Sequence, residues 1–307
     1  MSEPAWTDPH IGGVLTPVRH WVGVWVAGAR PKTLGAAIAP ALVGTAAATI
    51  DGPIRWGRAV AALVVALALQ VGVNYANDYS DGVRGTDKDR RGPVRLVAGG
   101  LASPAAVRNA SAIAFAVAAI VGGVLSLVVN PWLLVVGLAA LIAAITYTGG
   151  PKPYGYLGLG EVMVLAFFGF VATVGSAYVQ YRQLPGVAWW GALAVGLPAC
   201  AILLANNVRD VETDSVAQKR TLAVRFGAAR ARLLFTGCMV GALLAIVACG
   251  VLHPWAFLAL AAAPLGITPV QLVRTRSEPP SLVAALLGTV RFQLALAALL
   301  AVGLWIG

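Results

Sequence analysis

Long runs of apolar residues alternate with short polar segments along almost the whole chain. A helix needs roughly 17–25 mostly apolar residues to cross the hydrocarbon core of a bilayer. The narrowest breaks, Asn130-Pro131 and His253-Pro254, are typical of tight turns at a membrane face. The pattern predicts an all-α, polytopic membrane protein with nine transmembrane helices, at about residues 33–50, 58–79, 104–127, 131–149, 159–181, 187–206, 229–250, 254–273 and 281–306.

Composition and the first residues agree with this prediction. Hydrophobic residues make up 59% of the chain and charged residues only 11%, whereas soluble proteins have about 25% charged residues. Residues 1–20 contain Glu3 and Asp8, and they lack the basic start and small-residue cleavage site of a signal peptide. We therefore expect a flexible cytoplasmic tail at residues 1–20 and a single membrane domain at residues 21–307.

The distribution of Lys and Arg predicts how the chain is oriented, because cytoplasmic loops carry the excess of these residues. Of the 22 basic residues, all but Arg55, Arg58, Arg182 and Arg291 fall on one side of the predicted bundle. That side is then cytoplasmic and includes the N-terminus, whereas the C-terminus lies outside. The net charge of +10 is explained by this orientation and by attraction to anionic lipid headgroups, so no nucleic acid is needed as a partner.

Two clusters of Asn and Asp stand where long apolar runs end. They read Asn74-x-x-Asn77-Asp78-x-x-Asp81 and Asn206-Asn207-x-x-Asp210-x-x-x-Asp214. The chain has 12 acidic residues, and most of them lie in these two neighbourhoods: Asp78, Asp81, Asp87, Asp89, Asp210, Glu212 and Asp214. A chain with few acids elsewhere concentrates them at one predicted membrane face, which indicates a functional site.

The spacing predicts which way these side chains face. If the second span continues one turn further, Asn74 and Asp78 are i,i+4 neighbours, as are Asn77 and Asp81, and we expect all four on one side of the helix end. The second cluster forms another row at i,i+4 spacing. Two facing rows would form a cage for Mg²⁺, which binds one or two carboxylates together with waters and phosphate oxygens. The candidate metal ligands are Asn74, Asp78, Asp81, Asp210 and Asp214.

Basic residues are interleaved with these acids. Acids alone would suit Ca²⁺ and bases alone would only set orientation, but together they favour a metal-bridged polyanion. Solvated loops of mixed charge are the plainer alternative, and they do not explain why the Asn-Asp pattern follows two different spans. The candidate substrate-binding residues in and beside the two clusters are Asn77, Arg84, Arg91, Arg95, Asn207, Arg209 and Lys219.

The loop after the fourth span is the third informative stretch. It runs from Tyr147 to Glu161, and Pro151 and Pro153 restrict its backbone. Lys152 is the only cation of this loop, so orientation alone explains it less well than other basic residues. Tyr154 is a candidate substrate contact or an anchor at the membrane interface. Arg30, just before the first span, is likewise either an orientation signal or a ligand contact.

These features together resemble the UbiA superfamily of intramembrane aromatic prenyltransferases. The resemblance rests on the nine spans, the Arg30-Pro31 pair and the motifs Asn77-Asp78-x-x-Asp81 and Asp210-x-x-x-Asp214. Three stretches are similar to the branch that acts in menaquinone biosynthesis. They are residues 77–87 with 91–95, residues 153–161, and residues 206–214 with 219–222. The similarity extends from about residue 28 onward. Where the wider superfamily often has a third aspartate in the first motif, this chain has Gly85.

The resemblance implies a multi-pass enzyme of a bacterial plasma membrane. It would transfer a polyprenyl group from a polyprenyl diphosphate to 1,4-dihydroxy-2-naphthoate, with loss of CO₂ and diphosphate, to give a demethylmenaquinol. Two Mg²⁺ ions would lie between the two clusters, and Arg30 or Tyr147 would orient the aromatic acid. The catalytic candidates are then Asp78, Asp81, Asp210, Asp214 and Lys152.

Two alternatives stay open from the sequence. Within the superfamily, the acceptor could instead be 4-hydroxybenzoate, haem, a glycerol phosphate or a phosphoribose donor. From another class, the chain could be a divalent-cation transporter with two related halves. A transporter should bury acids near the middle of the membrane, whereas these clusters lie at cytoplasmic span ends, so we favour an enzyme.

Overall fold

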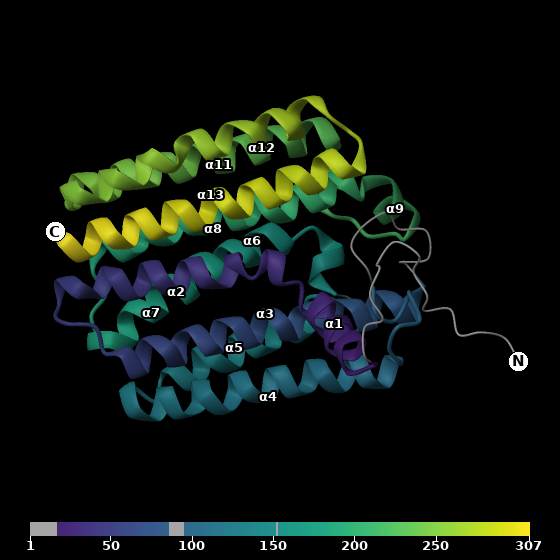
Figure 1. Ribbon diagram of the computed structural model, residues 1–307, viewed down its shortest axis with the longest axis horizontal. Helices are drawn as coiled ribbons and strands as arrows, with labels where there is room; N and C mark the ends of the chain where they lie inside the picture. Colours follow the sequence, from purple (N-terminus) through teal and green to yellow (C-terminus); the bar gives the residue numbers. More distant parts are fainter. Residues whose placement is uncertain (1–16, 86–94, 152) are drawn as a thin grey trace, which may run out of the picture.

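In a computed structural model of the chain, residues 17–85, 95–151 and 153–307 are described, and they form helices joined by short turns with no strand among them (Figure 1). The helical segments are α1 (Pro17–Ala29), η1 (Pro31–Thr33), α2 (Gly35–Ala47), η2 (Ala48–Ile50), α3 (Trp56–Arg84), α4 (Pro104–Val129), α5 (Leu133–Thr146), η3 (Tyr154–Leu157), α6 (Gly160–Val164), η4 (Leu165–Val171), α7 (Ala172–Tyr181), α8 (Gly186–Arg209), α9 (Val211–Val216), α10 (Leu222–Phe226), α11 (Ala228–Leu252), η5 (Pro254–Ala262), α12 (Ala263–Thr275) and α13 (Pro279–Ile306).

The long helices lie side by side along the longest axis of the molecule, with α1 and α9 at one end and the C-terminus at the other (Figure 1). The predicted all-α membrane fold is confirmed. Within the described part of the chain, seven helical segments are long and apolar enough to cross a membrane, and an eighth is obtained if one bent pair counts as a span. Helix α5 is shorter, with 14 residues, so the predicted count of nine spans is approximate.

The first predicted span, 33–50, is the second half of that bent pair. The helical segments Trp21–Thr33 and Gly35–Ile50 meet at 54°. Arg30 adopts a left-handed backbone conformation with φ of 55°, and Pro31, which has no N–H to donate, starts a new helix after it. Helix α1 begins at Pro17, inside the segment predicted as a tail, while residues 1–16 lie outside the described residues.

Helix α3 carries the first Asn-Asp cluster in its last turns. It has 29 residues and ends at Arg84, and Gly85 follows as the C-cap with a left-handed φ of 71° that favours glycine. The helix therefore continues past the predicted end at residue 79, which is the condition under which the i,i+4 spacing applies to the cluster. This continuation keeps Asn74 through Asp81 in regular helical geometry at the end where α1 and α9 lie.

Close helix packing fixes where the second cluster lies. Helix α8 is the most buried of the seven long candidate spans, and it crosses the fifth span where Gly196 meets Gly169. A Cβ atom on Gly196 would lie 2.6 Å from the Gly169 Cα, so this contact requires small residues. Gly169 belongs to η4, a π-helical segment of seven residues. This packing positions the C-terminal end of α8, where Asn206 and Asn207 line an internal cavity.

Candidate functional site

A cavity of about 1430 Å³ lies among the helices and receives side chains from both Asn-Asp clusters. Along α3 its lining runs from Ala62 to Asp81, which is roughly 28 Å at 1.5 Å per helical residue. The end near Asp81 is polar, and the rest is an apolar arm between α3, α4, α5 and α7. The arm is lined largely by small and aliphatic residues, including Val65, Gly123, Gly137 and Gly175.

The first cluster is divided between two faces of α3, which corrects our expectation of a single side. Asn77 and Asp81 line the cavity, whereas Asp78 does not. Asp78 is 1% exposed, and its two carboxylate oxygens accept hydrogen bonds from the backbone N–H groups of Leu96 and Val97. Consecutive helical residues point about 100° apart, so Asp78 cannot share the face of Asn77. The predicted role of Asp78 as a metal ligand is not supported by this placement.

Asp81 is the centre of the polar end. Its Oδ1 accepts hydrogen bonds from the Tyr156 hydroxyl at 2.9 Å and from Lys219 Nζ at 2.8 Å. Its Oδ2 lies 3.7 Å from Arg95 Nη2. Lys219 Nζ also lies 4.8 Å from the centroid of the Tyr156 ring, within the range of a cation–π interaction. Burial alone would lower the pKa of Lys219, but the neighbouring Asp81 carboxylate outweighs it and raises that pKa, so the amine is charged.

The second cluster forms the row that its spacing predicts. Asp210 N–H donates to the Asn206 carbonyl at 3.0 Å, and Asp214 N–H donates to the Asp210 carbonyl at 2.8 Å, so the helical pattern continues from α8 into α9. Asn206, Asp210 and Asp214 all line the cavity. The Arg209 guanidinium donates two hydrogen bonds to the Asp210 carboxylate, at 2.7 and 2.6 Å.

The predicted cage of facing carboxylates is found only in part. Among the residues that the structure describes, no three Asp, Glu, His or Cys side chains lie close enough together to hold a metal ion by themselves. Asp81, Asp210 and Asp214 share one cavity, but Lys219, Arg95 and Arg209 stand next to them. Like charges so close together are unfavourable without cations, which explains the mixed arrangement.

The 147–156 loop supplies the aromatic wall of the polar end. The rings of Tyr147 and Tyr154 lie 5.4 Å apart at 61°, and both line the cavity. Burial raises the pKa of Tyr154 to about 12. The pKa of Tyr147 is also raised, mainly by burial and to a smaller extent by the nearby Glu161 carboxylate. Both phenols are therefore neutral hydrogen-bond donors at physiological pH.

Arg84 does not line the cavity, contrary to its predicted substrate contact. Its guanidinium donates to the Gly150 carbonyl at 2.8 Å and lies 5.2 Å from the Tyr156 ring centroid. Arg84 is exposed on the last turn of α3. It therefore contacts the 147–156 loop and not the cavity. The predicted contacts Arg91 and Lys152 lie outside the described residues.

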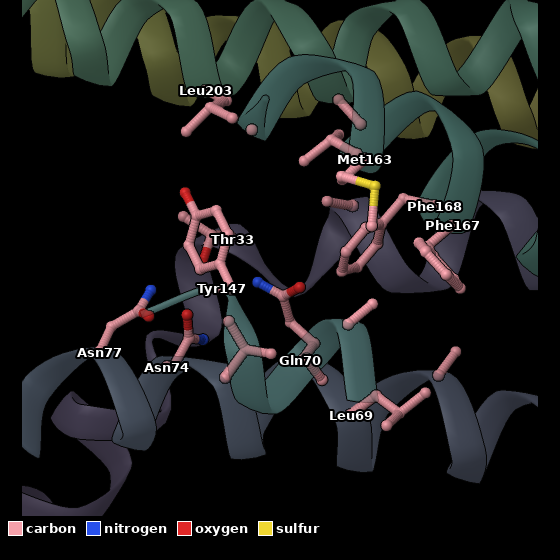
Figure 2. A pocket seen from close by; sticks show the side chains of 18 of the residues that line it. Thr33, Leu69, Gln70, Asn74, Asn77, Tyr147, Met163, Phe167, Phe168 and Leu203 are labelled. Atoms are coloured by element: carbon pink, nitrogen blue, oxygen red, sulfur yellow. The ribbon is translucent and has the colours of Figure 1, made fainter. Parts of the chain in front are cut away.

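Some cavity residues were missing from the predicted site. Tyr156 was not among the predicted site residues, although it lines the cavity and its hydroxyl donates to Asp81. Gln70 extends from α3 toward the space that Tyr147, Asn74 and Asn77 enter (Figure 2). A lone polar residue inside an apolar span was the signal that could have identified Gln70.

Three further predicted site residues line the cavity and differ in their hydrogen bonds. Asn207 lines the cavity and donates to Glu161 Oε1 at 2.8 Å. Asn74 also lines it, but its amide donates to the Ala29 carbonyl at 2.9 Å. Arg30 lines the cavity as well, and its Nη2 is buried without a hydrogen-bond partner among the described residues. A buried, charged donor of this kind is suited to an anionic ligand.

The chain is similar to known proteins over most of its length. A model of the UbiA prenyltransferase family matches residues 37–296. A Mycobacterium tuberculosis protein named 1,4-dihydroxy-2-naphthoate octaprenyltransferase is 48% identical over 251 residues, covering 82% of this chain and 86% of the relative. An Escherichia coli protein of the same name is 37% identical over 292 residues, covering 92% and 95%.

Two solved structures share the fold at low sequence identity. A UbiA homologue from Aeropyrum pernix K1, in its apo form, has a TM-score of 0.62 at 15% identity and covers 95% of this chain and 99% of its own. A UbiA homologue from Archaeoglobus fulgidus, bound to GPP and Mg²⁺, has a TM-score of 0.62 at 15% identity and covers 90% and 99%.

Proposed function

Because this chain belongs to the UbiA prenyltransferase family, we propose that it transfers a polyprenyl group from a polyprenyl diphosphate to 1,4-dihydroxy-2-naphthoate, a step of menaquinone biosynthesis. The observation that carries the proposal is the single cavity with charged residues of both motifs at one end and a long apolar arm at the other. A diphosphate with an isoprenoid tail has the same division into a charged and an apolar part. The names of the relatives support the naphthoate as acceptor.

We further propose that Mg²⁺ binds at the polar end, with Asn77 and Asp81 on one side and Asp210 and Asp214 on the other. The donor set fits a hard cation, because it consists of carboxylate and amide oxygens. Asn77 Oδ1 is buried and accepts no hydrogen bond from the described residues, so it is a suitable ligand atom. Mg²⁺ binds through one or two carboxylates, so the three carboxylates of this set suggest two ions. When bound, the metal would stabilise negative charge on the diphosphate oxygens.

The cations of the polar end would bind the diphosphate as it leaves. Lys219, Arg95 and Arg209 all line the cavity, and we keep Arg91 and Lys152 as further candidates. Charge grows on the departing oxygen as the allylic C–O bond breaks, and both electrons of that bond leave with the diphosphate. Preorganised positive groups stabilise this developing charge more than they stabilise the ground state.

The aromatic acceptor would lie between the polar end and the arm. We assign its carboxylate to the Arg30 guanidinium and its ring to the wall formed by Tyr147 and Tyr154. The ring carbon that carries the carboxylate forms the new C–C bond to the allylic carbon. The electrons of the bond to the carboxylate then restore the aromatic ring, and CO₂ leaves, so this step requires no base to remove a ring proton.

We propose a bacterial plasma membrane as the location, with the polar end of the cavity cytoplasmic and the C-terminus outside. Excess Lys and Arg on one side of the bundle supports this orientation. Helices α1 and α9 lie at the end opposite the C-terminus (Figure 1).

The test is an assay of the purified protein in nanodiscs with Mg²⁺, a polyprenyl diphosphate and 1,4-dihydroxy-2-naphthoate, with 4-hydroxybenzoate in parallel. Mass spectrometry should detect a prenylated naphthoquinol that lacks the carboxylate. Product with 4-hydroxybenzoate alone would contradict the proposed acceptor. Absence of product with either acceptor, together with metal uptake by proteoliposomes, would favour the transporter.

The apolar arm provides a prediction about chain length. Gly175 on α7 lines the arm, and a Cβ atom there would meet nothing within 4 Å, so a larger side chain would project into the cavity. Gly175→Phe is expected to lower kcat/KM for octaprenyl diphosphate by about tenfold or more, since overpacking costs about 1–3 kcal/mol. Turnover of the shorter geranyl diphosphate should change little.

Gly237→Phe is the matched control. Gly237 lies inside helix α11, and a Cβ atom there would also meet nothing within 4 Å, but this glycine is exposed and does not line the cavity. The Gly237→Phe variant should treat both donors as the wild type does. Equal losses for the two donors in Gly175→Phe would argue against the arm as the binding site of the tail.

A further inference from the structure

Asp78 belongs to the first motif, but both of its carboxylate oxygens are used away from the cavity. Oδ2 accepts the Leu96 N–H at 2.9 Å, and Oδ1 accepts the Val97 N–H at 3.0 Å. A carboxylate that accepts two consecutive backbone amides forms a charge-assisted pair of hydrogen bonds with a defined geometry. Asp78 thus fixes the path of the backbone at residues 96 and 97.

The segment that Asp78 holds is a compact turn leading into α4. Leu101 N–H donates to the Leu96 carbonyl at 2.8 Å, and the Leu96 side chain is fully buried in a small core with Tyr75 and Val107. Gly82, one turn after Asp78 on α3, meets the same segment. A Cβ atom on Gly82 would lie 2.5 Å from Val97 Cγ1. This face of α3 is therefore shaped to receive the turn.

The turn connects Asp78 to the site through Arg95. Arg95 directly precedes the two amides, lines the cavity, and places its Nη2 3.7 Å from Asp81 Oδ2. Two acids on adjacent faces of α3 therefore act on the same polar end of the cavity. Asp81 contacts Arg95 directly, and Asp78 acts on Arg95 through the backbone of the turn. We infer that Asp78 is a positioning residue that holds Arg95 at the diphosphate subsite and does not ligate the metal.

This inference rests on the proposed function, and a double-mutant cycle tests it. Asp78→Asn keeps the size of the side chain but replaces one acceptor oxygen by an NH₂ donor, so one of the two backbone N–H groups loses its acceptor. It is expected to lower kcat/KM for the polyprenyl diphosphate by about tenfold, because Arg95 would be displaced from the departing diphosphate, with the Mg²⁺ concentration for half-maximal activity changed less than about threefold. Arg95→Ala should have a similar effect, and the double variant should be little worse than either single variant.

Gly82→Ala provides a second route to the same result. It alters no charge, but its methyl group would displace Val97, so it should reproduce the fall in kcat/KM at unchanged Mg²⁺ requirement. Amide hydrogen exchange should be faster at Leu96 and Val97 in both Asp78→Asn and Gly82→Ala. Asp81→Asn is the contrast, because it should change the Mg²⁺ requirement and leave exchange in the turn nearly unchanged.

Two results would overturn the inference. The first is a Mg²⁺ requirement that rises tenfold or more in Asp78→Asn while the amide exchange rates of the turn stay unchanged. The second is that the effects of Asp78→Asn and Arg95→Ala on kcat/KM add fully in the double variant, again with unchanged exchange rates. Failure of the proposed function is distinguishable, because the wild type would then give no prenylated product. Hydrogen exchange and a Mg²⁺-dependent thermal shift would still report on Asp78 in that case.

Discussion

Asp81→Asn is expected to lower kcat by about a thousandfold, the upper range for removing one preorganised electrostatic group from an active site. Asp81 is 4% exposed and contacts Tyr156 and Lys219 through one oxygen, with Arg95 near the other. The amide keeps the shape but removes the charge that holds these groups and, in our proposal, a metal ligand. The measurement is steady-state turnover of naphthoate at saturating diphosphate and Mg²⁺.

Asp51→Asn is the matched control for that prediction. Asp51 is exposed and follows η2, in the connection between α2 and α3, away from the cavity lining, so its variant should retain wild-type activity. Loss of Asp81 also leaves Lys219 buried without its charge partner, which is destabilising. Thermal unfolding must therefore be measured in parallel. A folded Asp81→Asn enzyme with activity within tenfold of the wild type would contradict the assignment.

The sequence predicted the helical segments well because each apolar run is bounded by polar residues or proline. The first segment was the exception. Arg30-Pro31 was identified as a possible ligand contact, but the left-handed Arg30 and the helix before it were not predicted. Residues 17–29 are too short and too mixed in polarity to be a span, so periodicity gave no sign that they form one arm of a bent pair.

The division of the first cluster illustrates what a sequence leaves undetermined. Helical spacing correctly placed Asn77 and Asp81 on one face, but it does not say whether Asp78 shares the face that Asn74, Asn77 and Asp81 present to the cavity. That choice depends on the turn at residues 95–97, which lies beyond the end of α3 and occupies one face of that helix through Asp78 and Gly82. Two acids three residues apart therefore acquire different environments.

Tyr156 was missed for a similar reason. Near a membrane face, tyrosine is usually an interfacial anchor, and nothing in its own loop distinguishes the two roles. Its carbonyl accepts the Arg220 N–H at 2.9 Å, which brings the 147–156 loop to the segment that carries Lys219. Contacts between loops so distant in sequence become visible only in the folded structure, whereas the cations themselves could be recognised from their place beside the acids.

Removal of divalent metal is expected to reduce turnover to the uncatalysed background. Asp81, Asp210 and Asp214 line the cavity that would receive a diphosphate, and their charges repel a polyanion at short range. Lys219, Arg95 and Arg209 offset these acids, but the same cations would also have to neutralise the diphosphate. In our proposal, an added cation is therefore required for both binding and ionisation. Dialysis against a chelator should abolish product formation, and Mg²⁺ should restore it.

A readout independent of turnover separates a metal held by the protein from one that only accompanies the substrate. A ligand that binds the folded state at about 100 times its Kd stabilises that state by about 2.7 kcal/mol, so Mg²⁺ should raise the unfolding temperature of the wild type. Asp214→Asn should lose most of this shift, whereas Asp51→Asn should keep it. Full turnover in the presence of chelator would contradict the metal site, and an equal shift in both variants would mean that Mg²⁺ binds elsewhere on the protein.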